Sequence, residues 1–476
     1  MAIKRYVASA DNTITNAFKA NLTSRGTGSN MGAADVLEVF SIYGQASSSS
    51  LEKSRVLVKF PINTLIDDIN NGVVPDGASY YLRLFNVAHN DTTPTNFTLE
   101  IKQVSGSWDE GTGLDMNEYT DIGNSNWIVA NSSSSGIVSW SNQGGDYYTD
   151  IVTASFDSGV EDLEVDVTSL VHDWLNQGSK SIANNGFGIM LSSSLENSTY
   201  RSYYTKKFSA RSSEYFYKRP IIEVRWDSSR QDDRGNFYIS SSAVSSTDNL
   251  NTLYLYNYVR GQLKDINGIG TGNIYLNLYA SLNSTALTTA PRTPITGTWV
   301  STGIYKASVA VNTTASVLYD VWFSGSNQYH TGTIVPKTFS NSEYVVGTDR
   351  KIVSITNLKN SYTPDEYPKL RLYVRSKSWN PTIYTKATTD VEQEYINNLY
   401  YRIYRVQDGL DVIANAATAS TNHTKVSYDI SGSYFPLDMS LFEPGYMYAI
   451  KFIIKEENNY LKELDEVFKF RVDQWA

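Results

Sequence analysis

The alternation of apolar and polar residues changes period within one stretch of the chain, residues 164–175. Val165 and Val167 alternate with acidic residues, which is typical of a half-buried strand. From there the apolar residues follow helical spacing and predict a short helix; they are Val167, Leu170, Val171, Trp174 and Leu175. We expect Asp166 to cap the start of this helix and Gly178 to end it in a left-handed conformation.

Period-two alternation recurs along the whole chain and predicts strands. The predicted strands are 55–60, 80–87, 97–104, 187–191, 221–226, 253–256, 274–278, 305–311, 318–323, 370–374, 401–405, 448–452 and 468–472. Long helical patterns are nearly absent, and the many Tyr, Ser, Thr and Asn residues also favour β-structure. We therefore predict an all-β protein built from β-sandwiches.

The polar segment 227–236 carries several charges, lacks apolar periodicity and is the first predicted domain boundary. A chain of 476 residues suits about three domains. We predict a jelly-roll-like sandwich over residues 1–227, followed by two immunoglobulin-like sandwiches over 228–341 and 342–476.

Residues 109–150 interrupt the first predicted domain with a long polar segment. It contains two tryptophans, Trp127 and Trp140. A segment of this length inside a compact domain usually has its own hairpin or serves an interface. We keep both interpretations.

Composition excludes several classes of site and partner. The chain has no cysteine, which excludes disulfides, thiolate zinc sites and cysteine nucleophiles. The net charge is −9 and no Lys/Arg cluster stands out, so we expect no nucleic-acid partner. No stretch approaches the roughly 20 apolar residues of a membrane-spanning helix. Residues 1–11 lack the apolar core of a secretory signal peptide.

Several segments occur in the order typical of one known family. They are "ASADNTITNAF", "RVLVKFPINTL", "ASYYLRLFNV", "LEIKQVSGSWDEG", "VDVTSLVHDWLNQG", "NNGFGIML" and "RPIIEVRW". Together they resemble a DNRLRE domain over about residues 1–226. The resemblance implies a jelly-roll sandwich of a family found on bacterial surface proteins and phage particles, in which some members are carbohydrate-binding modules.

A second resemblance extends over nearly the whole chain. Segments such as "KRPIIEVRWDSSRQDDRGNFYISSSAV", "RLYVRSKSWNPTIYT" and "YFPLDMSLFEPGYMYAIKF" are similar to virion structural proteins of large tailed phages of the T4-like, marine kind. This resemblance implies a non-enzymatic particle component of the neck, tail, baseplate or capsid. Its expected partners are other virion proteins or further copies of itself, and it would be assembled in the host cytoplasm.

The best candidate binding residues combine aromatic rings with cations. They are Arg201, Tyr203, Tyr204, Lys206, Lys207, Arg211, Tyr215 and Tyr217, with Phe216 and Lys218 beside them. Aromatic faces stack on sugar rings, and cations hold acidic sugars. The same composition marks protein–protein hot spots. A third interpretation is ordinary sandwich packing, in which cationic stems lie along tyrosine rings.

An acidic cluster follows Trp108 and is a candidate calcium site. Asp109, Glu110 and Asp115, with Glu118, supply the oxygen ligands that calcium prefers. Their spacing does not match a helix-loop-helix calcium loop. The alternative is a solvated loop whose tryptophan packs on the sandwich. We expect no other cofactor.

Other possible chemistry is weak, so we predict no enzyme. His172 beside Asp173 lacks a nucleophile motif and is expected at a helix edge. Residues 268–272 are Gly-rich, but no Lys-Ser/Thr follows, which predicts a turn between two strands. Besides a virion protein, the hypotheses are a carbohydrate-binding adhesion module that contacts the host cell surface and an accessory domain of a polysaccharide-degrading enzyme. The missing signal peptide and catalytic constellation disfavour the last.

Overall fold

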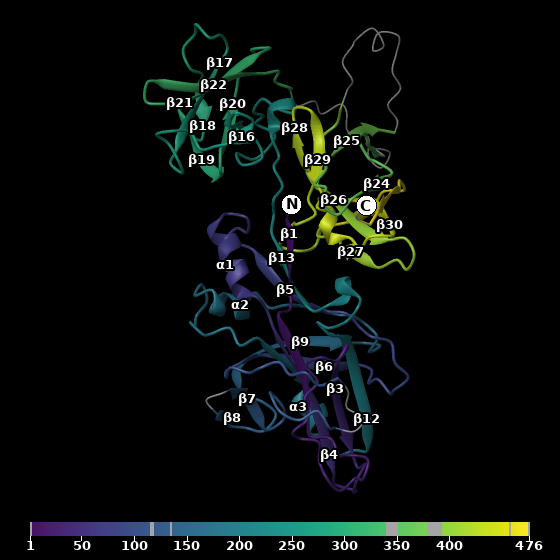
Figure 1. Ribbon diagram of the computed structural model, residues 1–476. Helices are drawn as coiled ribbons and strands as arrows, with labels where there is room; N and C mark the ends of the chain where they lie inside the picture. The colour runs from purple at the N-terminus through teal and green to yellow at the C-terminus, as the bar shows by residue number, and fades with distance from the viewer. Residues whose placement is uncertain are drawn as a thin grey trace. The chain divides into compact units, whose positions relative to one another are not determined.

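A computed structural model of the chain describes residues 2–114, 119–133, 136–338, 351–377, 393–456 and 458–474. The chain divides into two compact units, Ala2–Trp226 and Asp227–Ala476 (Figure 1). Antiparallel strands form nearly all of the regular structure in both units. The prediction of an all-β protein with sandwich domains is confirmed.

The first unit contains two large antiparallel sheets and a small two-stranded one. The four-stranded sheet has the order β1 (Ile3–Val7), β13 (Ile221–Arg225), β5 (Ser79–Leu84) and β10 (Leu163–Asp166). The seven-stranded sheet has the order β12 (Ser202–Ser209), β3 (Val36–Tyr43), β4 (Leu51–Lys59), β11 (Phe187–Leu191), β6 (Phe97–Val104) and β9 (Tyr147–Phe156), with β2 (Ala10–Thr15) also paired to β4. Many neighbouring strands are distant in sequence, so the sheets depend on non-local pairing.

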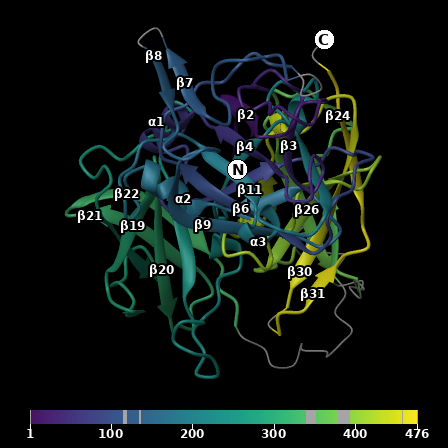
Figure 2. The same ribbon diagram turned by 90° about the horizontal axis from the view of Figure 1, so that it is seen from below.

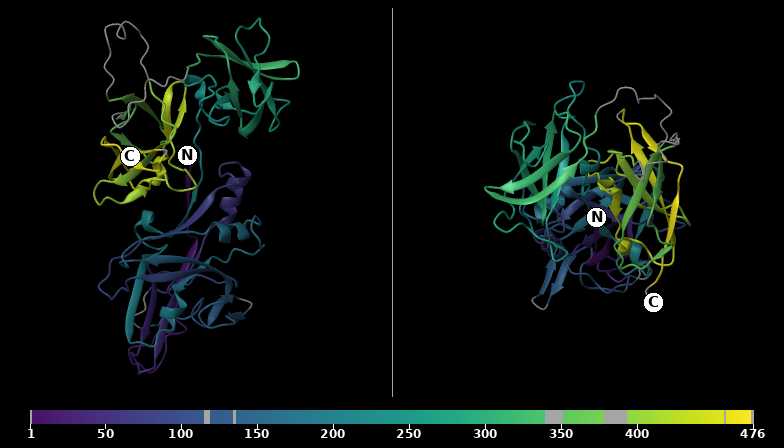
Figure 3. Two further views of the ribbon diagram at one scale, coloured as in Figure 1. Left: turned by 180° about the vertical axis from the view of Figure 1, so that it is seen from behind. Right: turned by 90° about the horizontal axis from the view of Figure 1, so that it is seen from above.

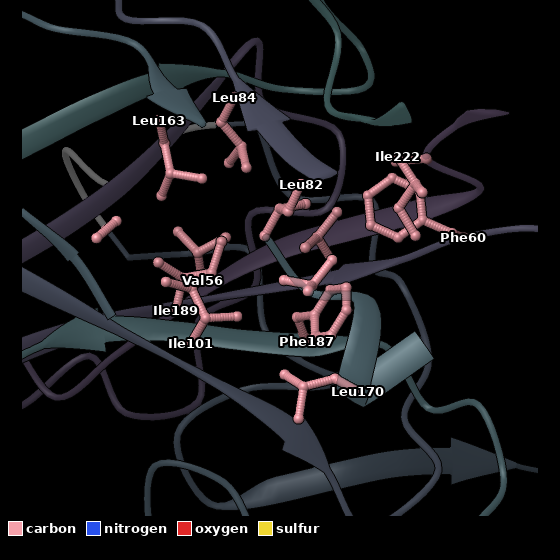
Figure 4. Close-up of a cluster of buried hydrophobic side chains, with 14 of the residues drawn as sticks. Val56, Phe60, Leu82, Leu84, Ile101, Leu163, Leu170, Phe187, Ile189 and Ile222 are labelled. Atoms are coloured by element: carbon pink, nitrogen blue, oxygen red, sulfur yellow. The ribbon is translucent and has the colours of Figure 1, made fainter. Parts of the chain in front are cut away.

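A large hydrophobic core contains the apolar side chains of both large sheets (Figure 4). Val56 of β4, Leu82 of β5, Ile189 of β11 and Ile222 of β13 are all almost completely buried. Leu170 of helix α2 (Thr168–Trp174) joins the same core, and Leu65 of α1 (Ile62–Asn70) also packs there. The alternation of apolar residues along each strand accounts for this packing.

Helix α2 forms where the change of period predicts it, but its ends differ in detail. Val167 holds the N-cap position, while the Asp166 carboxylate accepts a 2.9 Å hydrogen bond from the Thr168 amide. The prediction that Gly178 supplies the left-handed stop is wrong. Asn176 has φ of 57° and takes that conformation, which Asn tolerates better than most residues. A Cβ on Gly178 would instead meet Asp173 Oδ1 at 2.2 Å.

The long polar segment forms a hairpin and closes a second core. The hairpin pairs β7 (Val129–Ser133) with β8 (Gly136–Ser139), as Figure 2 shows. The second core, here called the tryptophan cluster, contains Ile14, Leu57, Val104, Trp108, Trp127, Ala130 and Trp140. Leu57 alternates with Val56 and Val58 along β4, so this strand contributes side chains to both cores.

The second unit begins with a sandwich formed by one seven-stranded sheet, which encloses a hydrophobic core. Its order is β14 (Asn251–Tyr256), β20 (Ile304–Val311), β19 (Ile295–Ser301), β17 (Ile274–Tyr279), β21 (Leu318–Ser324) and β22 (Asn327–Ile334), with β18 (Thr289–Ala290) on β20 and a separate pair, β15 (Tyr258–Val259) and β16 (Gln262–Leu263). Strand β19 changes partner along its length: Ile295 pairs with β17, and Thr298 pairs with β20. The core includes Leu276, Tyr305 and Trp322.

A second sandwich in this unit has two sheets, which can be followed in green and yellow in Figure 3. One contains β23 (Lys351–Ile355), β25 (Lys369–Ser376), β29 (Gly432–Pro436) and β28 (Ser427–Asp429). The other contains β24 (Ser361–Tyr362), β32 (Phe468–Val472), β30 (Met447–Lys455), β26 (Leu399–Arg405) and β27 (Asp411–Ile413), with β31 (Leu461–Glu463) on β30. The predicted boundary at 341/342 lies outside the described residues.

The polar segment 227–236 is tied into the second unit by buried ionic contacts. Arg234 donates to both carboxylate oxygens of the fully buried Asp320, at 2.5 and 2.7 Å. The Asp233 carboxylate accepts from the Tyr428 hydroxyl and from the Thr252 amide, each at 2.6 Å. The charged residues of this segment therefore hold it against the second unit. The lack of apolar periodicity in the sequence gives no sign of these contacts.

Candidate functional site

The predicted aromatic and basic residues do not form one exposed surface, and Lys206 shows this most clearly. Its side chain is fully buried. The amino group donates to Asn86 Oδ1 at 2.6 Å and to the carbonyl oxygens of Gly159 and Glu161 at 2.8 Å each. Burial lowers the pKa of Lys206 to about 8. Lys206 points inward with Phe208, because residues two apart share one side of a strand, so an exposed binding role for it is wrong.

The neighbouring cations of this set are already paired with carboxylates. Lys207 Nζ lies 2.8 Å from Asp91 and 3.6 Å from Glu38. Arg211 binds both oxygens of Glu110, with distances of 2.9 and 2.7 Å. These pairs use the positive charge of Lys207 and Arg211, whereas Arg201 donates to the Tyr203 hydroxyl at 3.5 Å.

The residues around Tyr215 form a separate exposed turn that contains the 3-10 helix η1 (Phe216–Lys218). Tyr215 and Phe216 are 54% and 53% exposed. Lys218 lies 5.4 Å from the Tyr215 ring, and the Tyr217 ring meets the Phe216 ring edge-on at 5.4 Å. The charged ends of Lys218 and Arg219 lie over the Tyr215 and Phe216 rings, so these cations are engaged within the turn itself.

The acidic cluster after Trp108 is partly used by internal hydrogen bonds. Glu110 is bound by Arg211 and also accepts from the Asp11 amide at 2.8 Å. Asp109 Oδ2 accepts from the Ser132 amide at 3.2 Å. Among the residues that the structure describes, no group of three His, Asp or Glu side chains is placed to hold a metal ion. Asp115 and Glu118 lie outside those residues, so the calcium site stays a prediction.

One open feature of the first unit is a groove that includes Tyr203 and Tyr204. Its volume is about 440 Å³, which lies within the range of small-molecule sites. Strands β3, β4 and β12 contribute side chains to it, and we call it the β3–β12 groove. Its aromatic and acidic lining residues are Phe18, Phe40, Tyr119, Tyr203, Tyr204, Glu38, Glu52 and Asp91.

Strand register explains how these side chains come together. Tyr203 and Glu52 both pair with Ile42, from the strands on either side of it. Thr205 pairs with Phe40 in the same way. Directly paired residues project to the same side of a sheet, so aromatic, aliphatic and acidic side chains meet there.

Two carboxylates give the groove its electrostatic character. Glu38 Oε1 accepts a 2.5 Å hydrogen bond from the Thr205 hydroxyl. Glu52 is only 1% exposed. Its Oε2 accepts from the Phe18 amide at 2.7 Å, while its buried Oε1 has no hydrogen-bond partner. Burial raises the pKa of Glu52, and burial with these two acids raises the pKa of Tyr119 to about 12.

Sequence patterns find only Tyr203 and Tyr204 among these lining residues. Phe40 and Glu38 lie in a region that composition describes as polar, and Phe18 lies in a loop. The spacing of Leu37 with Val39 and of Phe40 with Ile42 within 36–43 was the available signal for a strand. Register between distant strands, which determines the groove, carries no local signal.

The two other sequence features are His172 and the Gly-rich segment 268–272. His172 on α2 meets the Tyr80 ring edge-on at 5.7 Å. Gly268 and Gly270 have φ of 84° and 57° in a turn between β16 and β17, as predicted. In the described part of the chain, no helix has both the length and the apolar character needed to cross a membrane.

No known family model matches the chain, and neither does any curated protein. Among solved structures, the chain is similar to the N-terminal Ig1-2 module of the Drosophila receptor protein tyrosine phosphatase DLAR, at 9% identity, covering 47% of this chain and 90% of that one, with a TM-score of 0.15. It is also similar to the Yersinia pseudotuberculosis adhesin InvE, at 15% identity, 50% and 57% coverage and a TM-score of 0.16. A Ca²⁺-stabilized, ice-binding adhesin of an Antarctic bacterium gives 8% identity, 98% and 100% coverage and a TM-score of 0.15. Similarities this low carry no conclusion about function.

Proposed function

We propose that this chain is a non-enzymatic structural component of a tailed-phage virion. Its β-sandwich domains would contact neighbouring proteins of the particle, or further copies of the chain, at the neck, tail, baseplate or capsid. The DNRLRE-like first domain and the virion-protein-like remainder are part of the same proposal. Under this proposal the chain is synthesised in the host cytoplasm and then assembled into the particle.

The observation that carries this proposal is that the segments resembling the DNRLRE family coincide with strands of the first unit's two large sheets. The segments "RVLVKF", "ASYYLRL", "LEIKQV", "NNGFGIML" and "RPIIEVR" contribute β4, β5, β6, β11 and β13, which belong to the two large sheets of the first unit. The segment "VDVTSLVHDW" contributes β10 and α2. The residues that resemble the family are therefore those that build the sandwich.

Electron microscopy of the phage that encodes this chain tests the virion role. Purified particles are labelled with an antibody against the full chain, and antibody pre-absorbed with the chain is the control. We expect label at one position on each particle. Intact particles that carry no label, from a preparation in which the antibody detects the free chain, would refute the proposal.

The second candidate is a carbohydrate-binding adhesion module, and the β3–β12 groove favours it. The groove combines aromatic faces, on which sugar rings stack, with carboxylates that accept hydrogen bonds from sugar hydroxyls. This candidate is compatible with a place on the particle, because an adhesion module exposed there would contact the host surface.

A further inference from the structure

We propose that the β3–β12 groove binds an amino sugar and discriminates against acidic sugars. This inference rests on the second candidate function, carbohydrate binding. It departs from the expectation, drawn from sequence, that arginine and lysine side chains beside Tyr203 hold acidic sugars.

The first step is the charge of the groove. Its lining contains the carboxylates of Glu38, Glu52 and Asp91, and no lysine or arginine. Lys207 lies beside the groove, and its amino group is shared between Asp91 and Glu38. Arg25, which lies over the Phe18 ring at 4.1 Å, donates to the carbonyl oxygens of Asn16 and Leu51. The Arg201 guanidinium, 5.9 Å from the Tyr203 ring, is also close by but is not among the lining residues. The lining itself would therefore present like charges to an acidic sugar and opposite charges to a cationic one.

The second step is the unsatisfied hydrogen-bonding capacity of Glu52. One of its carboxylate oxygens accepts from the Phe18 amide, and the other is buried without a partner. Strand pairing with Ile42 directs Glu52 to the same side as Tyr203, so this negative charge lies at the groove. Because the free oxygen is itself buried, Glu52 would act on a ligand through its charge and not through direct contact. The partly exposed carboxylates of Glu38 and Asp91 only accept when ionised, so the complementary ligand supplies N–H or O–H donors.

The third step is the aromatic surface. Tyr203 is 43% exposed, and its ring has the Arg201 guanidinium at 5.9 Å. Phe40 and Phe18 supply further apolar surface to the groove. A pyranose ring has apolar C–H faces and a polar rim, which fits aromatic rings placed beside carboxylates. A simple inorganic cation has no apolar face and would leave this surface unused.

Calorimetric titration of the full chain at 0.15 M salt tests the proposal. The probes are a glucosamine hexasaccharide, its N-acetylated form, a neutral glucose hexasaccharide and a galacturonic acid hexasaccharide. We expect the glucosamine oligomer to bind at least tenfold more tightly than the acidic one, with the two uncharged probes between them. Moderate salt suppresses non-specific attraction of a cationic probe to a chain of net charge −9.

Matched variants locate the binding. Glu38→Gln and Tyr203→Ala are each expected to weaken glucosamine binding at least tenfold. Glu214→Gln, at an exposed acid outside the groove lining, and Tyr258→Ala, at a tyrosine 61% exposed in the other unit, are expected to bind as the unchanged chain does. Circular dichroism confirms that each variant is folded.

The possible outcomes separate the two claims. Equal or tighter binding of the acidic or neutral oligomer overturns the amino-sugar inference and leaves carbohydrate binding standing. Glucosamine binding that Glu38→Gln and Tyr203→Ala do not weaken also overturns the inference, because the site would lie elsewhere. If none of the probes binds, and a wider glycan array is also negative, carbohydrate binding falls with it. The virion role is tested separately by microscopy.

Discussion

The tryptophan cluster and the β3–β12 groove are two aromatic regions of the same unit, and they differ in how their polar atoms are satisfied. Trp108 and Trp140 are 7% and 6% exposed, and their indole N–H groups donate to the carbonyl oxygens of Asn185 and Asn126 at 2.7 and 2.9 Å. The groove instead keeps Tyr203 exposed and one oxygen of Glu52 unpaired. Aromatic content alone therefore does not identify a binding surface; unfilled space and unsatisfied polar groups do.

The largest effect is expected in the tryptophan cluster. Trp140→Ala removes a buried indole and its hydrogen bond, and should destabilise the first unit by about 3–5 kcal/mol. Urea unfolding followed by tryptophan fluorescence, with circular dichroism as a second probe, measures the change. Glycan binding below the new midpoint should be unchanged. A loss of less than about 1 kcal/mol would show that the cluster is not a true core.

The adjacent residues Lys206 and Lys207 of β12 compare a buried lysine with a partly exposed one. Lys206→Met leaves the oxygen acceptors of Asn86, Gly159 and Glu161 without their donor, and should cost about 3 kcal/mol. Lys207→Met removes only partly exposed ion pairs and should cost about 0–1 kcal/mol. Equal losses in parallel urea titrations would contradict the inward placement of Lys206.

Substitution of a groove residue should affect glycan binding and leave stability nearly unchanged, which is the opposite of the effect expected for Trp140. Tyr203→Ala removes a half-exposed ring, so the free energy of unfolding should change by less than about 1 kcal/mol. Glycan binding should weaken strongly. A large stability loss without a binding defect would show that Tyr203 serves packing. The groove would then be part of the core, as the tryptophan cluster is.

The smallest expected effect concerns the buried acid at the groove. Burial raises the pKa of Glu52 in the folded chain above its ordinary value of 4.5, so the folded state favours the protonated acid. Its contribution to stability is therefore present below that ordinary value and is lost as pH rises through the folded pKa. Glu52→Gln should be more stable than the unchanged chain at pH 7, and this gain should shrink at pH 4. A difference that does not depend on pH would contradict the burial of its charge.

Local pattern was enough to predict many of the strands and the short helix, because they depend on nearby residues, but it missed β3, β9 and β12. The strand predicted at 97–104 matches β6 at both ends, and the period change at Val167 marks the start of α2. The end of α2 was predicted wrongly because two residues there tolerate a left-handed conformation: Asn176 adopts it, and Gly178 instead permits a close approach to Asp173.

The site depended on information that the local pattern does not contain. Tyr203 and Tyr204 were identified by composition. Lys206, which was identified with them, is buried. Alternation along β12 could have placed Lys206 inward, but its polarity argued against that. Its three acceptors come from residues 45 to 120 positions away. Glu38 and Glu52 of the groove were missed because pairing between distant strands places them there, and the local sequence pattern does not contain that pairing.

Hydrogen exchange of the full chain, followed by mass spectrometry with and without the glucosamine hexasaccharide, most directly tests the central claim that the groove, and not the tryptophan cluster, is the binding surface. We predict slower exchange in peptides that cover β3 and β12 and no change in peptides that contain Trp127 or Trp140. Protection confined to the tryptophan cluster, or an unchanged groove at saturating ligand, would contradict the account.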